Sequence, residues 1–256
     1  MAQSNTGRFV WYELLTTDTK AAMAFYKDVV GWTTQPFEGG YEMWVGSQGP
    51  LGGIYPLPDA AKKMGAPPHW MAHVEVANVD ATIDQARKLD GKVLHGPEDI
   101  PKVGRFAIIG DPQGAMLSVF TPTEGMAPHD MTKPGEFCWN ELLTTNHEAA
   151  FRFYATLFGW EQLSDFDMGA MGKYLIYGKG PVRFGGMFTK SKDMPMPPSW
   201  LYYTQVADVD AAVARAKAKG AKLMNGPMEV PGGARIAQLM DPQGAAFALH
   251  EEPKKN

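Results

Sequence analysis

The chain has 256 residues, of which 45% are hydrophobic and 20% charged, and its net charge is −4. This composition is typical of a globular protein with enough length for two domains of ordinary size. The absence of a basic cluster excludes the electrostatic pattern of a nucleic-acid-binding protein. The single cysteine, Cys138, excludes an intrachain disulfide and is expected to be a small buried hydrophobic residue. Neither a long apolar run nor the apolar core of a signal peptide is present, so we expect a cytoplasmic protein that does not enter a membrane.

The sequence repeats itself at an interval of about half its length. Glu13 in the first copy corresponds to Glu141 in the second, an offset of 128 (141 − 13). The interval is too long for a solenoid repeat, so each copy is expected to be a domain. The matching segments are Gly7–Trp32 with Gly135–Trp160, His69–Pro101 with Ser199–Pro231, and the DPQG turns at 111–114 and 241–244.

The first part of each copy predicts a strand, a helix and three more strands. Trp11 and Glu13 lie on one face of an alternating segment, which is typical of a strand. Thr17 and Asp18 offer a helix cap, apolar residues follow at helical spacing, and Gly31 ends the helix. The next strands are expected at Thr33–Phe37, Tyr41–Val45 and Gly53–Leu57, with counterparts at Glu161–Phe166, Lys173–Tyr177 and Gly186–Thr189.

A proline-rich joint then opens a second part with the same order of elements. A strand is expected at Trp70–Val76 and a helix that ends at Gly91, followed by strands at Lys92–His95, Arg105–Ile109 and Ala115–Phe120. The DPQG sequence between the last two strands fits a type I turn. The order strand–helix–strand–strand–strand is therefore predicted four times. The expected modules are 7–62 and 68–122 in a first domain (7–122), then 135–190 and 198–252 in a second domain (135–252), with a linker at 123–134.

These features together resemble the vicinal oxygen chelate superfamily, which includes glyoxalase I, bleomycin-resistance proteins and extradiol dioxygenases. The resemblance rests on the paired modules, the helix segments AFYKDVVGW and RFYATLFGW, the helix starts NVDAT and DVDAA, and the late DPQG turns. The resemblance covers nearly the whole chain. The chain is similar to the bacterial tandem-domain members described as glyoxalase-like. The resemblance implies an α+β fold of four βαβββ modules, with each domain an open half-barrel around a cavity. In the metal-dependent members, four His or Glu ligands hold a divalent ion in that cavity.

Transferred residue by residue, the resemblance implies that the usual metal site is absent. The ligand positions fall on Trp11 and Trp139, near Met71 and Leu201, and on Ser118 and Ala248. The remaining ligand position falls in a strand without His, Glu, Asp or Cys in either domain. Because most of these side chains cannot bind a hard divalent ion, no cofactor is expected. The alternative is one divalent metal at a displaced site formed by Glu13, His73 and Glu75.

The inward carboxylates Glu13 and Glu141 are the candidate catalytic residues, because a buried charge that is present in both copies needs a partner or a task. Each could act as a general base or as an anchor for a donor on a ligand. A structural bond is the alternative, with Arg105 and Arg235 as possible partners. Since residues two apart share a face of a strand, the other expected cavity residues are Trp11, His73, Glu75, Ser118 and Phe120 in the first domain, and Trp139, Tyr203, Gln205 and His250 in the second.

Three functions follow from this pattern. The first is a glyoxalase/bleomycin-resistance-like protein that binds a small apolar or aromatic molecule without the usual metal. The second is an enzyme, either a glyoxalase-like lyase or isomerase or a dioxygenase or hydroxylase, which uses a displaced metal or Glu13 as a base. The third is a structural or interaction protein whose cavities are filled by residues such as Trp11, Met116 and Phe120. The two domains are expected to form an intrachain pseudo-dimer, in a chain that is a monomer or a homodimer.

Overall fold

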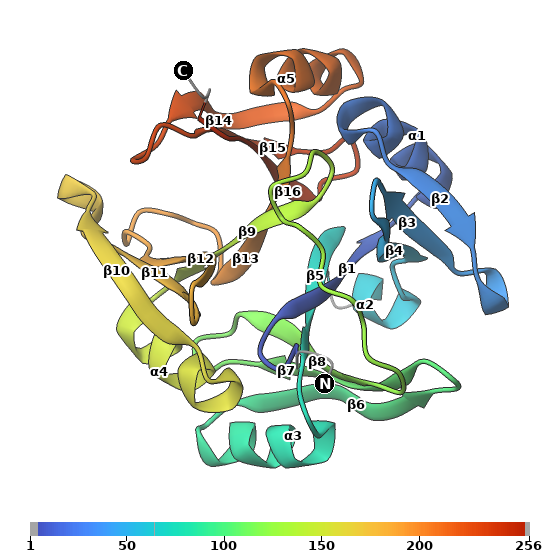
Figure 1. Cartoon of the computed structure of the whole chain (residues 1–256), viewed down its shortest axis with the longest axis vertical. Coiled ribbons are helices and arrows are strands. Elements are labelled where there is room, and N and C mark those ends of the chain that lie inside the picture. Colours follow the sequence, from blue (N-terminus) through green and yellow to red (C-terminus); the bar gives the residue numbers. More distant parts are fainter. Residues whose placement is uncertain (1–4, 64, 254–256) are drawn as a thin grey trace. The chain divides into compact units, whose positions relative to one another are not determined.

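The computed structural model describes residues 5–63 and 65–253, and the four predicted modules are present in it (Figure 1). The first half contains β1 (Phe9–Thr16), α1 (Thr19–Val30), β2 (Thr33–Pro36), β3 (Glu42–Gly46), β4 (Gly49–Pro56), α2 (Asp59–Lys63), β5 (His69–Glu75), α3 (Val79–Lys88), β6 (Lys92–Ile100), β7 (Gly104–Gly110) and β8 (Met116–Pro122). The second half contains β9 (Phe137–Thr144), α4 (His147–Phe158), β10 (Glu161–Asp167), β11 (Lys173–Lys179), β12 (Val182–Thr189), β13 (Ser199–Gln205), α5 (Val209–Ala218), β14 (Lys222–Glu229), β15 (Arg235–Met240) and β16 (Ala246–Glu251).

Each half forms one mixed sheet that is open rather than closed into a barrel. The strand orders are β2-β3-β4-β1-β5-β8-β7-β6 and β10-β11-β12-β9-β13-β16-β15-β14. In each module the first strand pairs in parallel with the last, and the remaining pairs are antiparallel. The expected α+β fold of paired βαβββ modules is therefore confirmed.

Helix α1 begins and ends where the sequence predicts, whereas α3 ends at Lys88, before the expected Gly91. The Asp18 side chain accepts a hydrogen bond from the Ala21 N–H at the start of α1, and Gly31 ends the helix with a φ of 85°. Asn78, Asn146 and Asp208 cap α3, α4 and α5 in the same way. A side-chain oxygen at this position pairs with an N–H that the helix itself cannot satisfy.

Two local features differ from the expected elements. Strand β6 continues to Ile100, because irregular register between His95 and Glu98 lets it pass through Gly96-Pro97 and pair again with β7. The short helix α2, which was not predicted, carries an ion pair of 3.2 Å between Lys62 and Asp59 one turn apart.

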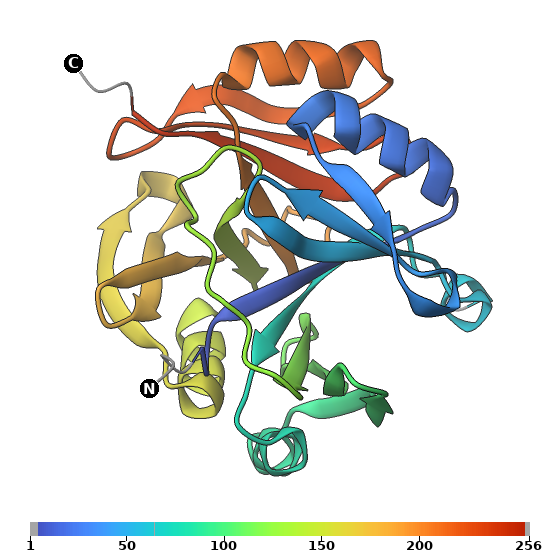
Figure 2. The ribbon, with the colours of Figure 1, turned by 45° about the vertical axis from the view of Figure 1, so that its right-hand side comes forward.

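The chain divides into two compact units, each of which takes one module from each half. One unit combines Met71–Pro128 with Trp139–Trp200, and therefore the second module with the third. The other combines Trp11–Trp70 with the chain from Leu201 onward, and therefore the first module with the fourth. Within this second unit α1 and α5 lie side by side (Figure 2), and the Arg215 side chain donates to the backbone oxygens of Asp28 and Val29.

The DPQG turns join the two modules of each unit. Asp241 accepts a hydrogen bond of 3.1 Å from the Tyr26 hydroxyl, which in turn accepts one of 3.0 Å from Trp70 Nε1. Gln243 accepts from the Thr16 and Thr17 hydroxyls, at 2.7 and 2.9 Å, just before α1. The other unit repeats the first contact with Asp111, Tyr154 and Trp200. The recurrence of these residues in the sequence therefore reflects packing between modules.

Two other repeated tryptophans also have structural roles. Trp32 Nε1 donates to the Gly135 carbonyl at 2.6 Å, and Trp160 Nε1 donates to the Gly7 carbonyl at the same distance. Both indoles are almost completely buried. Each of these hydrogen bonds ties a backbone segment, at Gly135 or Gly7, to a buried indole. Because the indoles are buried in the core, neither is accessible to a ligand.

Candidate functional site

A hydrogen-bonded set of three side chains lies on the partly buried face of the first strand, whose other face carries the buried Tyr12 and Leu14. Trp11 Nε1 donates to the Tyr41 hydroxyl oxygen at 2.9 Å, and that hydroxyl is hydrogen-bonded to the Glu13 carboxylate. Trp11 and Glu13 lie on β1, and Tyr41 directly precedes β3. We call this set the first triad.

The third module repeats the arrangement as a second triad. Trp139 Nε1 donates to the Tyr174 hydroxyl oxygen at 2.9 Å, and this hydroxyl donates to Glu141 Oε2 at 2.7 Å. All three residues of the first triad and two of the second, Trp139 and Glu141, are only partly buried. The carboxylates are therefore held in place while still reachable.

The glycine pairs of the sequence make room for these triads. A Cβ on Gly53 would lie 1.7 Å from the Tyr41 hydroxyl, and one on Gly186 would lie 1.9 Å from the Tyr174 ring. The preceding glycine of each pair faces the backbone of the parallel first strand instead. The glycine pairs mark a close approach of two strands, as expected. The second glycine of each pair also leaves space for the tyrosine side chain of the triad.

The direction of the bonds fixes the role of each group. Burial raises the pKa of Tyr41, and the neighbouring Glu13 carboxylate raises this pKa further. The tyrosine therefore keeps its proton and donates a hydrogen bond to the carboxylate, while the indole N–H donates a hydrogen bond to the tyrosine oxygen. The bonds thus run from the indole to the tyrosine and from the tyrosine to the glutamate, which is held as a hydrogen-bond acceptor.

The tyrosines were not among the predicted site residues, although the sequence contains a signal for them. Tyr41 stands 12 residues before Gly53 (53 − 41), and Tyr174 stands 12 residues before Gly186 (186 − 174). The predicted arginine partners were wrong. Arg105 binds Asp80 and Asp99, and Arg235 binds Asp210, all at the protein surface.

The second module brings its predicted cavity residues onto one face. Register pairs His73 with Ser118 and Glu75 with Phe120 across β5 and β8. The His73 ring lies 6.2 Å from that of Phe120, and burial raises the pKa of Glu75. Glu75 thus lies beside Phe120 on this face.

The fourth module places different chemistry on the corresponding face. His250 Nδ1 lies 2.7 Å from Gln205 Oε1, and Gln238 Nε2 donates to the Tyr203 hydroxyl at 2.6 Å. The predicted Tyr203, Gln205 and His250 are thus brought together, and Gln238 joins them.

The free thiol of Cys138 donates to the Tyr203 carbonyl at 3.5 Å, and burial raises the pKa of this thiol.

Acidification is expected to destabilise the protein through His250. Burial lowers the pKa of this histidine, the charge of Glu252 opposes the effect only in part, and the facing side chains of Gln205 and Ile236 carry no charge. The native pKa lies below that of an unfolded histidine, about 6.5, so the unfolded state binds the proton first. Stability that is present above this pH is therefore lost as the pH falls below it. In urea unfolding at about pH 7.5 and about pH 5, we expect the native chain to lose more stability than His250→Gln. Equal losses would contradict this assignment.

The residues at the expected ligand positions do not fit the divalent metal ion that metal-dependent members of the vicinal oxygen chelate superfamily hold. The positions of the usual ligands carry Trp11, Met71 and Ser118 in the first half, and none of these is a carboxylate or imidazole. Among the residues that the structure describes, no group of three or more His, Cys, Asp or Glu side chains is placed to hold a metal. Glu13, His73 and Glu75 do not form such a group, and Glu13 is bonded to Tyr41 instead.

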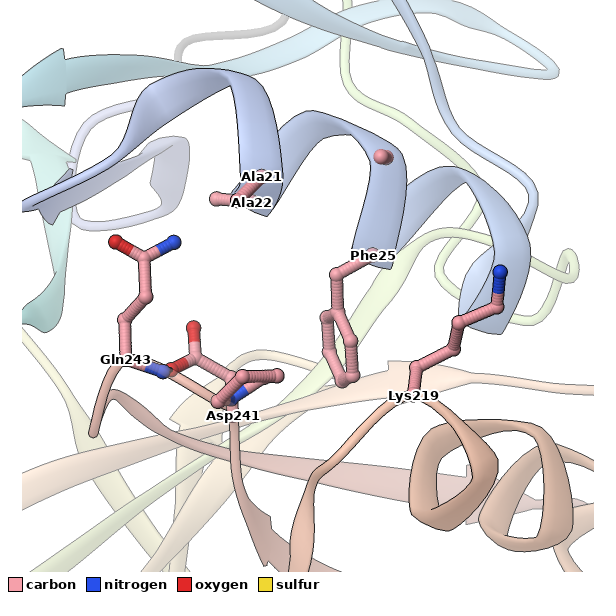
Figure 3. A pocket seen from close by; sticks show the side chains of 8 residues that line it. Ala21, Ala22, Phe25, Lys219, Asp241 and Gln243 are labelled. Carbon is pink, nitrogen blue, oxygen red and sulfur yellow. Dashed lines mark hydrogen bonds between the residues drawn. The ribbon is translucent and has the colours of Figure 1, made fainter.

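A separate pocket of about 290 Å³ lies in the unit formed by the first and fourth modules (Figure 3). It is lined by α1 through Ala21 and Phe25, by the turn through Asp241 and Gln243, and by Lys219. Asp241 and Gln243 are already used to join the two modules. The pocket is therefore a gap in a packing interface, and it contains none of the predicted site residues.

Comparison with known proteins supports the resemblance. The family model described as Glyoxalase/Bleomycin resistance protein/Dioxygenase superfamily matches residues 8–119 and 138–249. "Putative glyoxylase CFP32" of Mycobacterium tuberculosis is 33% identical over 93% of this chain and 92% of its own length. "Anthracycline biosynthesis protein DnrV" of Streptomyces peucetius is 28% identical over 98% of this chain and 95% of its own length.

Solved structures share the fold at low sequence identity. The Mn(II)-bound glyoxalase of Novosphingobium aromaticivorans is 17% identical with a TM-score of 0.66, over 98% of this chain and 84% of that one. Homoprotocatechuate 2,3-dioxygenase of Arthrobacter globiformis is 15% identical with a TM-score of 0.68, over 97% and 80%. Within the described part of this chain, no helix has the length and apolar character needed to cross a membrane. With both halves matched by one family model, the chain belongs to the glyoxalase/bleomycin resistance protein/dioxygenase superfamily and carries two copies of its domain.

Proposed function

We propose that this protein binds a small aromatic molecule that carries a hydroxyl or amine group, and that it does so without a metal at the usual ligand positions. The observation that carries the proposal is the triad, which occurs with the same three residue types in both halves. Core packing alone would not require a carboxylate at this position, because burying a charge is costly. A partly exposed acceptor that a tyrosine hydroxyl holds in place is suited to binding a donor group on a ligand.

The surroundings of the triads favour a flat ligand. In the third module, Phe166 and Phe188 stack on Tyr174, with ring centroids 5.0 and 5.8 Å away. In the first module, Phe37 contacts Tyr41 edge-on at 6.5 Å and is 41% exposed. Aromatic side chains of this kind form stacked or edge-on contacts with planar ligands. The name of the Streptomyces relative, which refers to anthracycline biosynthesis, is in keeping with a polycyclic aromatic ligand.

Replacing Glu13 or Glu141 by glutamine is expected to weaken binding of 2-naphthol at the altered site by about tenfold or more, because a hydrogen bond to a charged group contributes about 1.5–3 kcal/mol. Calorimetric titration in the presence of EDTA measures the affinity and the number of sites. Glu161→Gln, at an exposed glutamate of β10, is the matched control and should bind like the native chain.

Two results would contradict this proposal. Binding that requires a stoichiometric divalent metal would favour a metal-dependent member of the superfamily. No binding of the probe, with an unchanged fold, would favour the structural role. Met116 is 43% exposed, so this residue at least does not fill an interior space.

Metal-free catalysis by the same carboxylates is the second candidate. It is favoured by the hydrogen bond between the Tyr41 hydroxyl and Glu13, in which the carboxylate is the acceptor, as a general base must be. The names of the mycobacterial relative and of the manganese-bound structure point to glyoxalase-type substrates. Turnover of the methylglyoxal–glutathione hemithioacetal in EDTA, abolished by Glu13→Gln, would support it. The absence of turnover would leave binding as the function.

A further inference from the structure

The polar face of the fourth module consists of Tyr203, Gln205, Gln238 and His250, which we call the fourth-module face. Strand register places Tyr203 opposite Ala248 and Gln205 opposite His250 across β13 and β16. Gln238 lies opposite Ala248 from β15. Tyr203 and Gln205 are almost completely buried, and His250 is partly exposed. The face thus combines fixed polar groups with one ring that remains accessible.

The hydrogen bonds define which atoms of this face can receive a ligand. Gln205 Oε1 is an acceptor, so the hydrogen lies on His250 Nδ1 in the 2.7 Å contact between them. In a neutral ring this leaves Nε2 as an acceptor. The burial that lowers the pKa of His250 favours the neutral form. A ring whose tautomer is fixed in this way selects for a donor on its partner.

The second module shows that the fold does not require this network. With the offset of 130 residues between the second and fourth modules, Tyr203 corresponds to His73, Gln205 to Glu75 and His250 to Phe120. Gln238 corresponds to Ile108. The same strands form with these four substitutions, and the same register pairs are kept. The second module therefore lacks this network, and forming the strands does not require it. The polar side chains of the fourth module can thus be used to bind a ligand.

We propose that the fourth-module face is a binding site for neutral ligands that carry a hydrogen-bond donor, and that His250 Nε2 is the atom that receives the donor. This deepens the proposed function, on which it depends for the aromatic character of the ligand. The second module presents the carboxyl group of Glu75 and the ring of Phe120 at the corresponding positions. The two halves consequently differ in what they select, although their triads are alike.

The test compares 2-naphthol with 2-methoxynaphthalene, in which the donor is methylated. We expect His250→Phe, which installs the residue of the second module, to weaken 2-naphthol binding by about tenfold and 2-methoxynaphthalene binding by less than about twofold. His250→Gln keeps a polar side chain of similar length and should give an intermediate loss, with a smaller effect on folding. His95→Gln, at an exposed histidine, is the matched control and should change neither affinity.

Nitrogen-15 NMR of the histidine rings measures directly whether the probe reaches the His250 ring. Addition of 2-naphthol should shift the His250 Nε2 resonance, and addition of 2-methoxynaphthalene should not. Unchanged His250 resonances at saturating 2-naphthol would overturn this inference, as would an equal effect of His250→Phe on both probes. If 2-naphthol binding depends on Glu141 while the His250 resonances stay fixed, this inference fails and the proposed function stands. If the His250 shift persists and neither Glu13→Gln nor Glu141→Gln weakens binding, the proposed function fails and this inference stands.

Discussion

Replacing Gly185 by alanine is expected to lower the free energy of unfolding by about 3 kcal/mol or more. The added Cβ would lie 1.8 Å from the backbone oxygen of Asn140 on the adjacent parallel strand, which cannot move without disrupting the sheet. Gly52 has the same relation to the Tyr12 oxygen, at 2.0 Å, so Gly52→Ala should be similarly destabilising. Urea unfolding followed by circular dichroism measures both effects.

The neighbouring glycines provide an informative comparison. In Gly186→Ala the clash is with the Tyr174 side chain, which can rotate away, so we expect a smaller loss of stability together with a broken triad. Gly125→Ala, where a Cβ meets nothing within 4 Å, should be neutral. If Gly185→Ala proved as stable as Gly125→Ala, that result would contradict the close approach of β12 to β9 at Gly185.

Asp111→Ala is expected to destabilise the protein by about 3 kcal/mol, because it leaves two buried and two partly buried donors without their acceptor. Asp111 is 3% exposed and accepts the backbone N–H groups of Gln113, Gly114 and Ala115 at 2.7–2.9 Å. Its second oxygen accepts from the Tyr154 hydroxyl at 3.1 Å. The loss therefore affects both the turn and the contact between the second and third modules.

Tyr154→Phe separates these two contributions. It removes the hydrogen bond to Asp111 and the one that the hydroxyl accepts from Trp200, but leaves the turn bonds intact, and we expect a loss of about 1 kcal/mol. Thermal or urea unfolding of the two variants should show the larger loss in Asp111→Ala. Equal losses would mean that the turn bonds contribute little, and that the Asp111 carboxylate acts mainly through Tyr154.

The sequence was sufficient to predict the fold because its signals are local. The Asp18 cap, the Gly31 stop and the alternation through β1 each involve residues a few positions apart. The repeat then supplied the number of modules. What local patterns do not contain is which module packs against which, so the contacts of Asp111 with Tyr154 and of Asp241 with Tyr26 could be found only in the structure.

The candidate site was predicted in part for the same reason. Glu13 and Glu141 could be singled out, because a recurring charge on the inner face of a strand is unusual. Their tyrosine partners recur at a constant distance from the glycine pairs, but the contact itself depends on the strand pairing that brings each tyrosine over a glycine of the next strand. Arg105 recurs as well, but its long side chain reaches Asp80 at the surface, where both charges remain hydrated.

The exchange of modules between the two halves has a thermodynamic consequence. In a protein made of a single half, contacts such as those of Asp241 with Tyr26 would have to form between two molecules, and they would weaken on dilution. Here one covalent chain carries both partners, so they meet at an effective concentration on the order of millimolar, whatever the amount of protein in solution. Because both halves are joined in one chain, this association is a unimolecular folding step, and these contacts persist at dilutions where a dimer of half-chains would separate.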